Sequence, residues 1–147
     1  MKSLTISFVA FLSFMFISAS CIADGRKIPV NQIPALAQEF IKKHFADKTP
    51  AYAEKDRDGF GVKYEVKFTD GTEIDFRKNG EWDKVDCKYS AVPAALVPSA
   101  IANYVNTNFQ NATIVKIDKE RYGYEIELST DLELKFDHAG NLLSIDD

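Results

Sequence analysis

Acidic residues between positions 54 and 65 have a spacing that resembles a calcium-binding loop. With Glu54 as position 1, Asp56, Asp58 and Glu65 would supply oxygens at positions 3, 5 and 12, and Gly59 falls at position 6, where the loop must turn sharply. The match is imperfect, because position 1 is Glu rather than Asp and position 8 is a glycine. Both flanks have the pattern of strands rather than helices. We expect a charged hairpin turn here, with Glu54, Asp56, Asp58 and Glu65 as a weak alternative candidate for a metal site.

Groups that could perform catalysis are few. His44 and His138 are the only histidines, and neither belongs to a metal-ligand spacing such as H-E-x-x-H. No serine stands in a nucleophile-elbow sequence, and the glycines occur in turns rather than in a phosphate-binding loop. Carboxylates are numerous, but we expect them on a solvated face, where nothing would adjust a pKa for acid–base work. The sequence predicts a protein that is not an enzyme and needs no cofactor.

Charged residues alternate with apolar residues along the expected strands. In the stretch 60–68 every second residue is apolar from Phe60 onward, a period of two that buries one side of a strand and leaves the other in water. The charged side should form a sheet face without helices, either simply solvated or used to dock a protein or peptide. Docking needs aromatic anchors. Tyr52 and Trp82 are the best candidates, although both could equally belong to the core. The candidate partner-binding residues are Tyr52, Lys63, Glu65, Lys67, Asp75, Arg77, Trp82, Glu125, Glu127 and Lys135.

Two similar stretches organise the chain. Residues 64–82 and 124–142 match in residue type almost position by position, and each follows a helical pattern that starts near a proline, Pro34 or Pro98. The offset between the two copies falls from 64 residues in the helices to 60 in the strands, which indicates a four-residue insertion at 56–59. Trp82 and Tyr52 stand where the second copy has Leu142 and Lys116. The pattern predicts an α+β fold of two tandem repeats, each of one helix plus four antiparallel strands, with the helices packed on one face of a curved antiparallel sheet.

The N-terminus has the features of a secretory signal peptide over residues 1–23. Lys2 is followed by an apolar run at 4–17 and by small residues at 18–23, and the run is short for a membrane span. Cleavage after Ala23 is favoured; cleavage before Cys21, with a lipid anchor on that cysteine, is the alternative. We expect a periplasmic or secreted protein.

Charge and cysteine content limit the possible partners. The net charge is -4, and no basic cluster is present, so a nucleic-acid partner is disfavoured. If Cys21 is removed or lipidated, Cys87 has no intrachain partner. We expect Cys87 to be a small buried residue at a strand end, with a reactive or intermolecular thiol as the alternative.

Several segments together resemble a known family. They are the Val-Pro before the second helical pattern, Gly-Tyr-Glu-Ile-Glu-Leu at 123–128, Glu-Leu-Lys-Phe-Asp at 133–137 and Gly-Asn-Leu at 140–142. With their counterparts in the first copy, they resemble the PepSY-like proteins, secreted bacterial proteins related in fold to the β-lactamase inhibitor protein. The resemblance implies one repeat at 24–90 and another at 91–147.

What the resemblance suggests about activity is inhibition of an enzyme by protein contact, although no inhibitory loop motif can be identified. The leading hypothesis is a secreted, non-catalytic binding protein of the bacterial envelope, possibly inhibitor-like, acting on a protein or peptide through the helix-free sheet face and its hairpins. The alternative is an envelope sensor that binds calcium or a small molecule.

Overall fold

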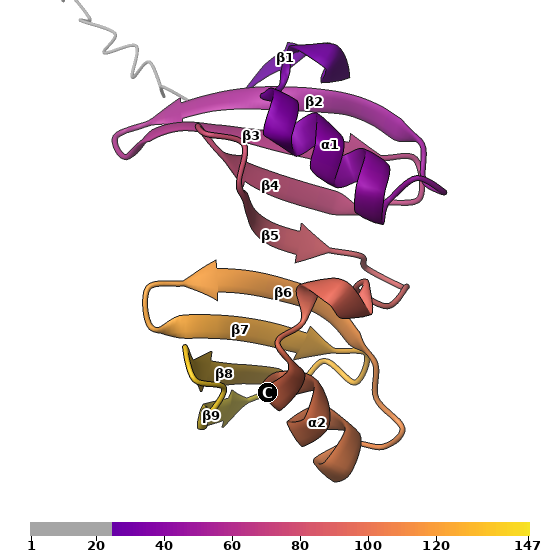
Figure 1. Ribbon diagram of the computed structural model, residues 1–147, viewed down its shortest axis with the longest axis vertical. Helices are drawn as coiled ribbons and strands as arrows, with labels where there is room; N and C mark the ends of the chain where they lie inside the picture. The colour runs from indigo at the N-terminus through magenta and orange to yellow at the C-terminus, as the bar shows by residue number, and fades with distance from the viewer. Residues whose placement is uncertain (1–24) are drawn as a thin grey trace, which may run out of the picture.

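The computed structural model describes residues 25–147, which form one antiparallel sheet with two α-helices on the same face (Figure 1). The predicted signal peptide and Cys21 lie outside the described residues. The first elements are β1 (Arg26–Ile28), η1 (Val30–Gln32), α1 (Ala35–His44), β2 (Pro50–Asp58), β3 (Gly61–Phe68), β4 (Glu73–Arg77) and β5 (Trp82–Asp86). They are followed by η2 (Ala94–Leu96), α2 (Ser99–Asn108), β6 (Ile114–Glu120), β7 (Gly123–Leu128), β8 (Glu133–Asp137) and β9 (Leu142–Asp146).

Each helix begins directly after a proline and buries one narrow apolar stripe. Pro34 and Pro98 are the N-caps of α1 and α2, where a missing backbone N–H costs nothing. Ala37 and Ile41 are buried in α1, and Ile101 and Val105 are buried in α2. These residues recur every four positions and therefore face the sheet from one side of the helix.

The core lies between the helices and one face of the sheet. Alternate residues of the central strands are fully buried, as the period-two pattern requires. The buried residues with no exposed surface in the strands include Val66, Ile74, Phe76, Val85, Ile117, Ile126, Leu128, Leu134 and Phe136. The residues between them face the opposite side, which no helix of the described chain covers (Figure 1).

The expected fold class, two tandem repeats of one helix and four antiparallel strands, is wrong. All nine strands form a single sheet in the order β1-β2-β3-β4-β5-β6-β7-β8-β9. β5 pairs directly with β6, with Val85 opposite Ile117, so the backbone groups of β5 and β6 satisfy each other. β1, which precedes α1, pairs with β2 and adds a strand that the sequence pattern did not reveal. The division at residues 90 and 91 stays a prediction.

The β2–β3 hairpin is longer than the sequence pattern predicts. β2 continues to Asp58, so residues 55–58 of the expected turn are strand, and the chain reverses at Gly59 and Phe60. Three cross-strand pairs follow Lys55↔Tyr64 in this hairpin, whereas one follows Lys119↔Tyr124 in the β6–β7 hairpin. The four-residue insertion therefore lengthens the hairpin by two pairs, and Figure 1 shows its tip projecting beyond β4 and β5.

β1 and β9 form the two outer edges of this sheet. β9 has five residues, of which Leu143 and Ile145 are 55% and 45% exposed. No helix within residues 25–147 is long and apolar enough to span a membrane.

Candidate functional site

The predicted charged residues do share the helix-free face of the sheet. They alternate with the buried residues of their strands, and cross-strand pairing sets them side by side. Lys63 lies opposite Arg77, Glu65 opposite Asp75, and Glu125 opposite Lys135. Lys67 and Glu127 occupy the same face, in β3 and β7. The result is a continuous charged surface.

Two lysines each bridge several carboxylates on this face. Lys67 Nζ lies 3.2 Å from a Glu65 oxygen and 3.5 Å from a Glu73 oxygen. Lys135 Nζ lies 3.0 Å from Asp146, 3.3 Å from Glu133 and 4.0 Å from Glu125. Hydrogen bonding to Glu65 raises the pKa of Lys67, and hydrogen bonding to Asp146 raises that of Lys135. These exposed pairs stabilise the sheet only slightly, because water screens them.

The centre of the face is less well neutralised. Asp75, Lys84 and Asp118 stand in one cross-strand row, and within the described residues none of the three side chains makes a hydrogen bond or a close ion pair. Burial, followed by repulsion from Glu120, raises the pKa of Asp118 to about 6. Burial and repulsion from Glu65 also raise the pKa of Asp75. The negative charges of these two carboxylates are therefore less well neutralised than those of the neighbouring carboxylates.

The two aromatic candidates lie on opposite faces of the sheet. Tyr52 pairs with Lys67 and therefore belongs to the helix-free face, where Lys27 Nζ lies 4.6 Å from the centre of its ring. Trp82 instead lies on the helix side, stacked on Phe40 with ring centres 6.1 Å apart. Trp82 cannot anchor a partner on the charged face.

The candidate calcium loop is part of the β2–β3 hairpin rather than a loop. Glu54 lies opposite Glu65, and Asp56 lies opposite Lys63. The side chain of Asp58 is not among those described. Among the described side chains, no group of three or more histidines, cysteines, aspartates or glutamates could hold a metal ion.

The hairpin tip carries a residue whose position the sequence pattern did not predict. Phe60 was expected in the buried row of β3, but it lies in the turn, and its side chain is fully exposed. The strand begins one residue later, at Gly61, which has a φ of +131°. The sequence did contain a signal for this position: the insertion at 56–59, which the second copy lacks.

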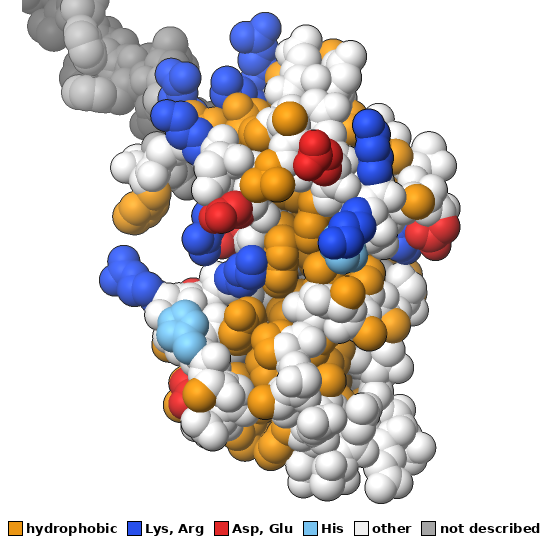
Figure 2. All heavy atoms as spheres, viewed as in Figure 1, with side chains coloured by type: hydrophobic (Ala, Val, Ile, Leu, Met, Phe, Trp, Pro, Cys, Tyr) orange, Lys and Arg blue, Asp and Glu red, His pale blue; other side chains and the backbone are white. Residues whose placement is uncertain are grey.

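A groove lies on the opposite, helix-bearing face. It has a volume of about 410 Å³ and is bounded by α1, the turn between β4 and β5, and the end of β6. A band of hydrophobic side chains runs down the middle of this face, with charged side chains beside it in the part that α1 covers (Figure 2). The lining residues are Leu36, Glu39, Phe40, Lys43, His44, Gly80, Glu81, Trp82 and Lys119.

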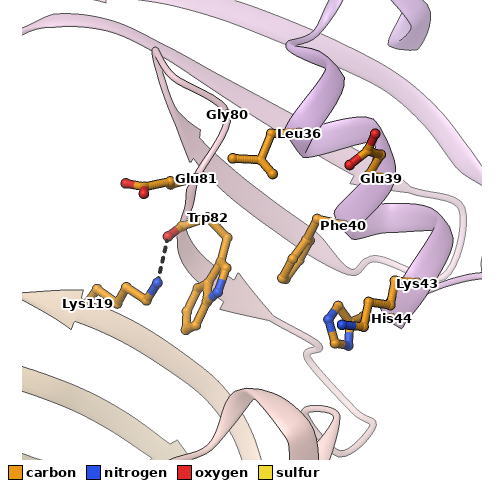
Figure 3. Close-up of a pocket in the computed structure, with 9 residues that line it drawn as sticks. All are labelled: Leu36, Glu39, Phe40, Lys43, His44, Gly80, Glu81, Trp82 and Lys119. Atoms are coloured by element: carbon orange, nitrogen blue, oxygen red, sulfur yellow. Dashed lines mark hydrogen bonds between the residues drawn. The ribbon is translucent and has the colours of Figure 1, made fainter.

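The aromatic residues of the groove pack against the core and against each other. Phe40 meets the buried Phe76 ring edge-on, with centres 5.6 Å apart and an angle of 84°. His44 lies 4.9 Å from Phe40 between ring centres, and burial, together with the charge of Lys43, lowers its pKa. In Figure 3 Phe40 and Trp82 point toward each other from α1 and β5, with Lys119 entering from β6.

Lys119 places a cation against Trp82. Its Nζ lies 3.7 Å from the centre of the Trp82 ring and donates a 3.2 Å hydrogen bond to the Trp82 carbonyl oxygen (Figure 3). Within the described residues this ammonium has no carboxylate in ion-pair contact. Burial and the charge of Arg77 lower its pKa. Sequence reasoning did not identify Lys119 or Phe40 as site residues, although it did single out Trp82 as the residue that replaces Leu142.

Comparison with known proteins identifies the family. The family described as "Putative beta-lactamase-inhibitor-like, PepSY-like" matches residues 62–144. The chain belongs to the PepSY-like family. No curated protein matches it significantly. The resemblance seen in the sequence is confirmed.

Three solved structures are similar to most of this chain. A "putative calcium-regulated periplasmic protein" of Bacteroides thetaiotaomicron is 46% identical, with a TM-score of 0.81 over 84% of this chain and 98% of that chain. A "putative periplasmic protein from DUF2874 family" of Bacteroides vulgatus is also 46% identical, with a TM-score of 0.81 over 86% of this chain and 99% of that chain. A second B. vulgatus protein, described as of unknown function, is 38% identical with a TM-score of 0.78, over 82% of this chain and 99% of that chain.

These relatives agree on a cellular location and name no catalytic activity. All three are described as periplasmic proteins, and the expected periplasmic location of this PepSY-like protein is confirmed. Neither the family description nor those of the structures names a reaction.

Proposed function

We propose that this PepSY-like protein is a non-catalytic binding protein of the envelope that docks a protein partner on its helix-free face and its β2–β3 hairpin. The family description, with its likeness to β-lactamase inhibitors, and the periplasmic location of the relatives support a role in protein contact. The partner carries an apolar pocket and, next to it, basic side chains.

The observation that carries this proposal is the exposure of Phe60. Its side chain is fully exposed at the tip of a hairpin that an insertion has lengthened by two cross-strand pairs. Leaving a phenyl ring exposed to water rather than burying it costs about 2 kcal/mol. A ring placed in this way suits an apolar pocket of a partner, because aromatic residues supply much of the binding free energy at interfaces.

The charge of the sheet face supports a basic partner. Within the described residues neither Asp75 nor Asp118 has a close ion pair, and Lys84 is the cation directly opposite both. A lysine or arginine of the partner that reached this row would supply a positive charge next to Asp75 and Asp118. Such complementarity raises the association rate and the specificity more than the affinity.

The test compares partner capture by matched variants. The purified mature protein, tethered by its C-terminus, is exposed to periplasmic extract, and bound proteins are identified by mass spectrometry. We expect a partner retained by wild type and by Tyr89→Ser, but lost with Phe60→Ser and weakened by Asp75→Lys. Tyr89 is a suitable control because it is 95% exposed at the opposite end of β5 from the hairpin tip. Equal capture by Phe60→Ser and Tyr89→Ser would falsify the proposal.

A calcium-responsive protein is the second candidate function. It is supported by the description of the B. thetaiotaomicron relative and by the direct opposition of Glu54 and Glu65 across β2 and β3. Like charges in that position repel, and a divalent cation between them would remove the repulsion. On this hypothesis millimolar calcium raises the melting temperature of wild type more than that of Glu54→Gln. Glu39→Gln, on α1, is the control. No calcium-dependent shift in wild type would exclude this candidate.

A further inference from the structure

The groove between α1 and β5 has an apolar floor that is already ordered. Phe40 and Trp82 are stacked at an interplanar angle of 27°, and Phe40 rests on the fully buried Phe76. Leu36, on the rim, is 49% exposed. A ligand would find these surfaces in position and would not have to order them, which lowers the entropic cost of binding.

One end of the groove presents an ammonium group that has no anionic partner in residues 25–147. Lys119 Nζ is held by the Trp82 ring and the Trp82 carbonyl oxygen, which leaves donor capacity unused. Other lysines of this protein do reach carboxylates: Lys67 and Lys135 each bridge at least two. Glu81 and Asp83 act on Lys119 only at longer range. A carboxylate brought to this point would gain a charge-assisted hydrogen bond in a partly desolvated position.

Lys55, the counterpart of Lys119 in the first copy, has no such position beside this groove. It stands in β2 opposite Tyr64, as Lys119 stands in β6 opposite Tyr124, and its Nζ lies 5.7 Å from the centre of the Tyr64 ring. Lys55 does not line the groove. Lys119, by contrast, reaches across the β5–β6 junction to the aromatic ring of the neighbouring strand.

We propose that this groove is a binding site for a small amphipathic anion, a carboxylate joined to a flat apolar body. The carboxylate accepts a hydrogen bond from Lys119 Nζ, and the apolar body lies along the exposed edges of Trp82 and Phe40, against Leu36. Glu39 and Glu81 also line the groove and repel anions, so the carboxylate is restricted to the end of the groove at Lys119. This site is on the opposite face from the proposed docking surface and does not depend on it.

The test uses three defined probes: 3-phenylpropionate, the neutral 3-phenylpropanol and acetate. Trp82 is the only tryptophan of the chain, so its emission reports on the groove directly. We expect 3-phenylpropionate to give a saturable change in Trp82 emission, and the other two probes to bind about tenfold more weakly, since each lacks one half of the recognised chemistry.

Two lysine variants separate binding from a purely structural role. Lys119→Met keeps the length of the side chain and removes its charge, and it should lower the affinity for 3-phenylpropionate to that for 3-phenylpropanol. Lys55→Met should bind 3-phenylpropionate as wild type does. Saturation-transfer NMR on the ligand repeats the comparison independently of tryptophan emission. If 3-phenylpropionate gives no saturable signal at millimolar concentration, or binds Lys119→Met as tightly as wild type, the proposal is overturned. Neither result would bear on the hairpin surface, which is tested by Phe60→Ser.

Discussion

Asp118 lies directly opposite Lys84 across the junction of β5 and β6, yet the two side chains form no close ion pair. Only two other residue pairs, Val85↔Ile117 and Asp86↔Lys116, join these strands. The junction therefore combines one buried apolar pair with charged pairs that water still reaches. The stability of the whole sheet should respond to changes here.

Replacing Asp118 by asparagine should stabilise the protein at neutral pH. Burial raises the pKa of Asp118 from 3.8 to about 6, so the folded state holds a proton that the unfolded chain releases. The protonated carboxyl of Asp118 contributes to the free energy of unfolding below pH 4. This contribution falls as the pH rises from 4 to about 6, and it is absent at higher pH. With allowance for solvent screening, Asp118→Asn gains about 1 kcal/mol at pH 7 and nothing at pH 3.5.

Urea unfolding of wild type and Asp118→Asn at several pH values between 3.5 and 7 measures this difference. The groups that act on Asp118 are Glu120 and Asp83, which favour the protonated form, and Lys84 and Lys116, which oppose it. A variant that is less stable than wild type by the same amount at every pH would contradict the prediction.

Asp70 should show the opposite dependence on pH. Its carboxylate accepts a hydrogen bond from Lys48 and another from the Thr72 backbone N–H, at 2.9 Å, and these bonds lower its pKa to about 2. Stability from this group is therefore present above pH 4 and is lost as the pH falls toward 2. Asp70→Asn can still accept the Thr72 N–H, so it removes mainly the charge.

We expect Asp70→Asn to lose about 0.5 kcal/mol at pH 7, a small effect because the side chain is 43% exposed. Lys48→Met should lose a similar amount, and the two losses should not add, since both remove the same pair. Thermal melts at pH 7 and pH 2 provide the measurement; losses that persist unchanged at pH 2 would rule out this explanation.

Two glycines that begin strands should differ sharply in their tolerance of alanine. Gly123 has a φ of +149°, and a Cβ there would lie 2.2 Å from the Phe136 carbonyl oxygen. Gly61 has a φ of +131°, but a Cβ there would meet no atom within 4 Å. Gly123→Ala should cost about 3 kcal/mol because the backbone of β8 must shift, whereas Gly61→Ala should cost about 1 kcal/mol of backbone strain. Equal midpoints of urea unfolding for the two variants would disprove the steric argument.

Cys87 should be chemically inert in the folded protein. Its side chain is 2% exposed, and burial raises the pKa of its thiol, so little thiolate is present at neutral pH. We expect labelling by a thiol reagent such as 5,5′-dithiobis(2-nitrobenzoate) to follow the unfolding transition in urea. Rapid labelling in buffer without urea would support the alternative of a reactive thiol.

The sequence predicted the strands well because alternation is a local property. The burial of Val66, Ile74 and Phe76 follows directly from their spacing, and Pro34 and Pro98 mark the starts of the helices. β1 was missed because a three-residue strand carries too little pattern to recognise. The pairing that joins the two copies into one sheet was not predicted, because nothing in β5 or β6 alone specifies that these strands pair.

The site was predicted less well because it depends on contacts between distant residues. Lys119 and Trp82 are 37 positions apart and meet only because β5 and β6 are neighbours. The side of the sheet on which Trp82 lies depends on a register shift between β4 and β5 at Asp75 and Phe76. Phe60 kept the alternation of β3 in sequence, but the tight turn at Gly59 moved it out of the strand.

The outer edge of β9 is one of two edges at which a further strand could pair with this sheet. Leu143 and Ile145 are exposed on a strand whose outward backbone groups face no further strand of the described chain. Such an edge can act as a template for another polypeptide, and native proteins protect it with short strands and charges. Here five residues and the ion pair between Asp146 and Lys135 provide that protection. Resistance to aggregation should therefore depend on the carboxylate of Asp146, whose partner Lys135 belongs to the charged face proposed for docking.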